Sequence, residues 1–133
     1  SLSEQWHNIL RTELKFTGLT VTDDMLMLQR SGVAEFSNVN ENAIRALSAG
    51  NDLLLFVLGD DPASNGVNLD QLVSAVATAV ASGRISEQRI NEAALRVMTA
   101  RRGLSAQAAS DTQECNIGCT IGYSLLFPLS THK

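Results

Sequence analysis

The stretch Asp52-Leu53-Leu54-Leu55-Phe56-Val57 begins with an acid and continues as an unbroken apolar run of strand length. Apolar residues at every position, rather than at alternate ones, predict a strand that is buried on both faces. Such strands occur in parallel sheets that helices cover on both sides. This stretch therefore favours an α/β fold with a parallel sheet.

The segments before this stretch also indicate helices and strands in alternation. Residues 41–49 have apolar positions at helical spacing, with Asn40 as the expected N-cap and Gly50 where a helix ends in a left-handed residue. Residues 3–15, which begin with a serine suited to the N-cap, predict an earlier helix. Residues 19–22 alternate, are rich in β-branched side chains and follow a glycine, so they predict a strand.

Two further helices are expected after the apolar strand. Asn68 and Gln71 have the spacing of a capping box, and Gly83 marks the end of the helix that they begin. Ser86 is the expected cap of a second helix, which Gly103 would terminate. The predicted order is helix, strand, helix, strand, helix, helix, which is typical of parallel β/α units.

The last part of the chain has a different composition. We expect residues 1–104 to form a partial β/α domain and residues 105–133 to be an atypical C-terminal tail, because charged residues become scarce there. The tail holds both cysteines, Cys115 and Cys119, whose spacing favours a free pair or an incidental disulfide over a zinc site. We hypothesise that the tail is foreign to the parent fold and that its deletion leaves folding intact.

Overall composition narrows the range of functions. The chain has 133 residues, a net charge of -4 and a pI near 5.0, which argues against nucleic acid as a partner. No apolar stretch approaches the roughly 18 residues of a membrane span, so no membrane partner is expected. The first residues lack the pattern of a secretory signal, which favours a cytoplasmic location, although a cleaved signal would leave the same start.

Two pairs of acids follow the predicted strands. Asp23 and Asp24 end the first strand, and Asp60 and Asp61 follow the second. In β/α folds the functional groups lie at the carboxyl ends of the strands. Because successive strand residues face opposite sides, Asp23 shares a face with Val21 while Asp24 points the other way. A carboxylate there could act as nucleophile, base or metal ligand, and solvated acids at an exposed strand end are the plain alternative.

Three ordered blocks of sequence resemble glycoside hydrolase family 3. They are residues 10–25 (LRTELKFTGLTVTDDM), residues 41–55 (ENAIRALSAGNDLLL) and residues 84–97 (RISEQRINEAALRV). The first resembles the family's nucleophile region, and the other two resemble segments that follow it in the same order. The resemblance covers about residues 1–104.

The resemblance implies a partial (β/α)8 TIM-type barrel, in which this chain supplies about the last two β/α units. It places Asp23 on the family's catalytic nucleophile, and it leaves Asp24 and Met25 as residues that support the nucleophile or the structure around it. The double acid resembles the β-N-acetylhexosaminidase branch. The implied reaction is retaining hydrolysis of β-N-acetylglucosaminides or related β-glycosides, without metal or organic cofactor. Asp60 and Asp61 receive no catalytic role, because the match fades in their loop.

The sequence departs from the family pattern in ways that leave the function open. The branch's acid/base histidine, its aspartate partner and its sugar-binding residues belong to earlier segments, and neither His7 nor His132 matches that position. Two strands cannot close a barrel and would expose unpaired edges. We therefore expect association, either as a homo-oligomer or with an N-terminal barrel segment. A catalytically incomplete fragment that acts as a self-associating or binding module is the alternative to a carbohydrate-cleaving hydrolase. A third reading, another enzyme activity on a new assembly, has no G-x-S-x-G or Cys/His arrangement to support it.

Overall fold

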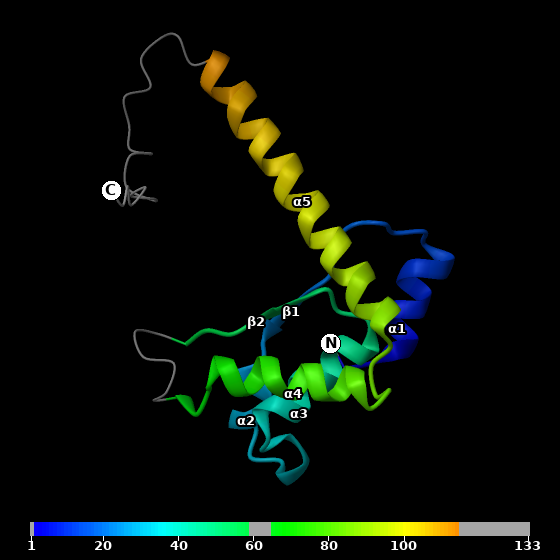
Figure 1. Ribbon diagram of the computed structural model, residues 1–133, viewed down its shortest axis with the longest axis vertical. Coiled ribbons are helices and arrows are strands. Elements are labelled where there is room, and N and C mark those ends of the chain that lie inside the picture. The colour runs from blue at the N-terminus through cyan, green and yellow to red at the C-terminus, as the bar shows by residue number, and fades with distance from the viewer. Residues whose placement is uncertain (1, 59–64, 115–133) are drawn as a thin grey trace. The chain divides into compact units, whose positions relative to one another are not determined.

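The computed structural model describes residues 2–58 and 65–114, with side chains as far as residue 104 (Figure 1). Within these ranges the chain forms two strands in one parallel sheet, together with helices that precede, join and follow them. The α/β class and the alternating order expected from the sequence are confirmed. The expected loop acids Asp60 and Asp61, the cysteines Cys115 and Cys119, and His132 lie outside the described residues.

The N-terminal helix forms as predicted, but its last turn is widened. α1 spans Glu4–Asn8, and a π-helical turn, η1, continues it over Ile9–Glu13. Ser3 is the N-cap, and its side chain accepts a hydrogen bond from the Trp6 N–H. Two of the helix's apolar side chains are largely uncovered, since Trp6 is 71% exposed and Leu14 is 69% exposed, whereas Ile9 and Leu10 are half-buried. This helix therefore leaves much of its apolar surface without a partner.

The two strands pair in parallel, as the β/α order requires. β1 spans Val21–Asp24 and β2 spans Leu53–Leu55, with Val21 opposite Leu53 and Asp24 opposite Leu55. β1 lies two residues later than the strand predicted over residues 19–22, so both acids belong to the strand itself. The sheet in the described part of the chain has these two strands alone.

The expectation that residues 52–57 are buried on both faces is wrong for this chain. Leu53 and Leu55 are 42% and 44% exposed, and Val57 is also exposed. The apolar run predicts a covered sheet, but among the described elements α3 packs on β2 from one side only. The apolar composition thus indicates that the strand can be buried on both faces, and its actual burial depends on which other elements cover it.

The segment between the strands contains three helical elements. α2 spans Leu26–Arg30, η2 is a 3-10 turn over Ala34–Phe36, and α3 spans Val39–Ala49. The cap of α3 is Asn38 rather than Asn40, because the Asn38 side chain accepts from the Glu41 N–H at 3.0 Å. α3 then ends at Gly50, where φ is +124° as expected for a glycine at this position.

α3 is the centre of the core. α4 spans Leu69–Ala81 and packs along α3, while α1, α2 and β2 contact other sides of α3 (Figure 1). Asn68 caps α4 as predicted, through a hydrogen bond from the Gln71 N–H, and Gly83 follows its end with φ of +76°. The buried apolar cluster and the side chains against it are Ile44, Ala79, Ile85, Leu47, Ala75, Val76, Val80 and Ile90.

The last helix is longer than predicted. α5 spans Glu87–Glu114, and Ser86 caps it by accepting from the Arg89 N–H. Gly103 does not terminate the helix, and its φ is not positive. One glycine inside a helix costs only about 1 kcal/mol, and the residues after it are compatible with helix, so the backbone continues. The chain divides into compact units at residues 1–101 and 102–133, and the proposed boundary at residue 104 remains a prediction.

Candidate functional site

The two acids at the carboxyl end of β1 differ in exposure. Asp23 is exposed and Asp24 is half-buried, while the neighbouring Thr22 is buried. Exposure alternates over Val21, Thr22 and Asp23 as the pleat of a strand requires, and the pairing with β2 is irregular between Val21 and Asp24. α3 packs on the sheet, and the opposite, exposed face carries Val21, Leu53, Leu55 and Asp23.

Asp23 is an accessible carboxylate at a fixed place in the fold. One of its oxygens, Oδ1, accepts a hydrogen bond of 2.8 Å from the backbone N–H of Asp24. The residue as a whole is exposed. A carboxylate held in this way can act as a nucleophile or as an electrostatic partner for a positive centre.

Asp24 and Met25, the neighbours expected to support Asp23, are held more firmly. The Asp24 carboxylate is 13% exposed and accepts hydrogen bonds from the backbone N–H groups of Leu26 and Val57. Met25 is buried, and its N–H donates to the carbonyl oxygen of Leu55 at 2.9 Å. Both residues therefore hold the end of β1 in place, and neither opens onto the face that carries Asp23.

A second charged cluster, which sequence reasoning did not find, lies at the amino ends of the strands. The Asp52 side chain is fully buried and accepts hydrogen bonds from three arginines: Arg11 at 2.7 Å, Arg89 at 2.9 Å and Arg96 at 2.8 Å. The backbone N–H and the hydroxyl of Thr20 also donate to it, both at 3.0 Å. This Asp52 cluster joins η1, both strands and α5.

The Asp52 carboxylate is ionised despite its burial. Burial by itself would raise the pKa of Asp52, but the hydrogen bonds from Thr20, Arg89 and Arg96 outweigh it, so the pKa lies below its usual value. A pocket of about 200 Å³ beside the cluster is lined by residues that include Arg11 and His7. Because functional groups in β/α folds gather at the carboxyl ends, a cluster at the amino ends indicates a role in stability.

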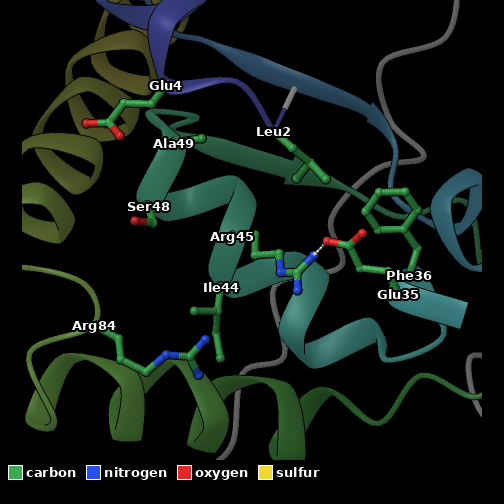
Figure 2. A pocket seen from close by; sticks show the side chains of 9 residues that line it. All are labelled: Leu2, Glu4, Glu35, Phe36, Ile44, Arg45, Ser48, Ala49 and Arg84. Atoms are coloured by element: carbon green, nitrogen blue, oxygen red, sulfur yellow. Dashed lines mark hydrogen bonds and ion pairs between the residues drawn. The ribbon is translucent and has the colours of Figure 1, made fainter.

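A groove lies along α3, away from both acids of β1. It has a volume of about 400 Å³ and is lined by residues from the N-terminus, η2, α3 and the turn before α5 (Figure 2). Arg45 reaches Glu35 across it with an ion pair of 2.6 Å. A hydrogen bond from Arg84 lowers the pKa of Glu41 on the same helix. Asp23 lines neither this groove nor the pocket beside Asp52.

Other predicted features have simple structural roles. The Nδ1 atom of His7 lies 2.9 Å from the carbonyl oxygen of Ser3, and the ring packs against Gly50.

No group of three or more metal-ligating side chains occurs among the residues that the structure describes. In the same part of the chain, no helix combines the length and the apolar character that crossing a bilayer requires.

Comparison with protein families agrees with the resemblance seen in the sequence blocks. The model of the glycosyl hydrolase family 3 N-terminal domain matches residues 1–100. The chain belongs to glycosyl hydrolase family 3. Searches of curated proteins and of solved structures found no match to it.

The match to glycosyl hydrolase family 3 covers both clusters described above. Asp23, Asp24 and the whole Asp52 cluster lie within the matched residues, and the stretch from 101 to 133 lies beyond them. The exposed carboxylate at the end of β1 therefore lies in a domain of a glycosidase family.

Proposed function

We propose that this chain supplies the nucleophile of a retaining β-glycoside hydrolase, and that Asp23 is that nucleophile. The observation that carries the proposal is the position of Asp23, an exposed carboxylate at the carboxyl end of a parallel strand in a family 3 glycosidase domain. The carboxyl ends of strands are where β/α enzymes place their reacting groups. Asp52, at the amino ends of the strands, is excluded as the nucleophile because three arginines bind its buried carboxylate.

The sheet face around Asp23 supports a partial (β/α)8 barrel in which β1 and β2 are neighbouring strands. Val21, Leu53 and Leu55 lie on the same exposed face as Asp23, opposite the face that α3 covers. Apolar side chains on the face away from the helices are those that fill the interior of a barrel. We infer that these two strands are about the last two of the barrel, with Asp23 at its mouth.

The proposed reaction is a double displacement. A carboxylate oxygen of Asp23 attacks the anomeric carbon as the bond to the leaving-group oxygen breaks, and an acid protonates that oxygen. Water then attacks the glycosyl-enzyme ester, gives up a proton to the same acid in its base form, and releases the sugar with the carboxylate. The substrate class that the resemblance supports is β-linked N-acetylglucosamine or a related β-glycoside.

The acid/base must come from another segment. A second carboxyl group about 5–5.5 Å from the nucleophile is the usual arrangement for retention. Asp24 cannot serve, because its carboxylate is only 13% exposed and binds backbone N–H groups. We propose that further copies of this chain, or an N-terminal barrel segment, cover the exposed sheet face and bring the missing groups.

A second candidate function is a non-catalytic module that binds through the same face. The observation that favours it is the exposure of Leu53, Leu55 and Val57, which would be unfavourable in an isolated monomer. In light scattering, Leu55→Asp should shift the chain towards monomer, whereas Leu69→Asp, at an exposed site on α4, should not. Association without hydrolysis would favour this candidate.

Hydrolysis of aryl β-glycosides tests the leading proposal. Release of nitrophenol from an aryl β-N-acetylglucosaminide and an aryl β-glucoside should occur with the native chain and be lost in Asp23→Asn. Asp70→Asn is the matched control, since it makes the same change at an exposed site on α4. Activity that survives in Asp23→Asn would reject this nucleophile, and inactivity of all three proteins would favour the non-catalytic candidate.

A further inference from the structure

Asp24 joins three elements through one carboxylate oxygen. Its Oδ1 accepts from the Leu26 N–H, at the start of α2, and from the Val57 N–H, beyond the end of β2, both at 3.1 Å. The last ladder bond before this point runs from the Met25 N–H to the Leu55 carbonyl oxygen. Where β1 turns into α2, the Val57 N–H would lose its backbone acceptor. The Asp24 side chain takes the place of that acceptor.

The second oxygen of Asp24 continues the connection to the chain after β2. Oδ2 lies 3.8 Å from Nη1 of Arg30, and Nη2 of the same arginine donates to Oδ1 of Asn65 at 3.1 Å. Asn65 in turn donates to the carbonyl oxygen of Leu58 at 2.7 Å. Arg30 is largely exposed, so this ion pair adds little energy, and its main effect is on orientation.

The orientation of Asp23 depends on the same short backbone segment. The N–H that donates to Asp23 belongs to Asp24, and the side chain of Asp24 in turn accepts from the N–H groups of Leu26 and Val57. The residue that orients the Asp23 carboxylate is therefore itself tied to α2 and to the chain after β2. A reacting group has to be held within roughly 0.5 Å and 10–20° of its productive position. The Asp24 carboxylate is only 13% exposed and both of its oxygens have partners within the protein, so it acts through the backbone.

We propose that Asp24 is a positioning residue for Asp23: its carboxylate holds the ends of β1, β2 and α2 together and thereby fixes the direction of the neighbouring carboxylate. The proposal rests on the role assigned to Asp23 above. The positioning role predicts different results for two variants at position 24. Asn at position 24 keeps an oxygen that can accept both N–H groups, whereas Ala removes the acceptor altogether.

Amide hydrogen exchange, followed by NMR, tests the positioning contacts without any substrate. In Asp24→Ala, the protection factors at residue 24, Leu26 and Val57 should fall about tenfold or more, while that of Asp52, whose N–H binds at the other end of the sheet, should not change. Asp24→Asn should retain most of the protection at all three sites. Unchanged protection at Val57 in Asp24→Ala would overturn the proposal.

Kinetics then separate positioning from a general loss of structure. Asp24→Ala should lower kcat for the aryl glycosides about 10- to 100-fold with less than about a twofold change in KM, and Asp24→Asn should restore most of kcat. Equal losses in Asp24→Asn and Asp24→Ala would mean that the charge, not the acceptor, is needed, and would reject positioning. If Asp23→Asn keeps its activity, the assigned nucleophile fails while the exchange result still decides whether Asp24 anchors the strand ends.

Discussion

Arg11 and Asp52, which are 41 residues apart in the chain, form a 2.7 Å ion pair at the amino ends of the two strands. The arginine belongs to the turn that follows α1, and the acid immediately precedes β2. Arg89 and Arg96 reach the same carboxylate from α5. The three sequence blocks that resemble the family thus meet at one buried carboxylate, at the end of the sheet opposite to Asp23.

Removing the Asp52 carboxylate should strongly destabilise the fold. Asp52→Ala leaves three partly buried arginines without their shared partner, and the expected loss in the free energy of unfolding is about 3–5 kcal/mol. Glu35→Gln removes the exposed partner of Arg45 and should cost less than about 1 kcal/mol. Urea unfolding of both variants measures the difference. Similar losses would show that the Asp52 cluster stabilises the fold no more than the exposed ion pair does.

The stabilisation from Asp52 should depend on pH in one direction. Its pKa is lower in the folded chain than the roughly 3.9 of an unfolded aspartate, because the hydrogen bonds from Thr20 and the arginines outweigh burial. Its contribution is therefore complete above about pH 5 and is lost as the pH falls below about 4, through the folded-state pKa. The difference in unfolding free energy between the native chain and Asp52→Asn should shrink below pH 4. A difference that grows on acidification would contradict the assigned ion pairs.

Gly50 should tolerate no side chain. Its φ is +124°, and a Cβ there would lie 2.7 Å from the Cβ of His7, so Gly50→Ala combines backbone strain with a clash against α1. We expect a loss of about 2–4 kcal/mol. Gly32→Ala is the control, because Gly32 also has a positive φ, +74°, but nothing within 4 Å of the added carbon. Thermal unfolding should rank Gly32→Ala clearly above Gly50→Ala in stability, and the reverse ranking would argue against the close contact of His7.

Gly103→Ala tests whether α5 continues past residue 102. Inside a helix this change should increase stability by about 0.5–1 kcal/mol, because alanine loses less backbone freedom than glycine. At a helix end with positive φ the same change would be unfavourable. Backbone chemical shifts of residues 101–106 give the answer directly. If the helical shifts stop at residue 103 and Gly103→Ala is less stable than the native chain, Gly103 terminates the helix, as predicted from the sequence.

Local signals predicted most of the elements, because those signals act over a few residues. The spacing Asn68 to Gln71 and the position of Gly50 each describe a contact within one helix turn, and both are found in the structure. Asn40 was the wrong cap for α3 because Asn38 has the same chemistry two residues earlier and meets the Glu41 N–H. Neighbouring residues of one type cannot be separated by propensity alone.

Features that depend on distant parts of the chain could not be predicted in this way. The pleat is a local signal, and Asp23 is exposed while Asp24 is half-buried. The arginine partners of Asp52, however, lie 37 to 44 residues away, and only the folded arrangement brings them together. The apolar run of β2 indicated a covered strand, yet Leu53 and Leu55 are exposed because coverage requires elements beyond the described sheet.

Covalent trapping tests the central claim most directly. The chain would be incubated with activated 2-deoxy-2-fluoro β-glycosides, which form the glycosyl-enzyme ester but hydrolyse slowly, and then analysed by intact mass and peptide mapping. We predict one adduct on the peptide that contains Asp23, present in Asp70→Asn and absent in Asp23→Asn. An adduct on a different residue, or the same adduct in Asp23→Asn, would contradict the assignment of Asp23 as the nucleophile.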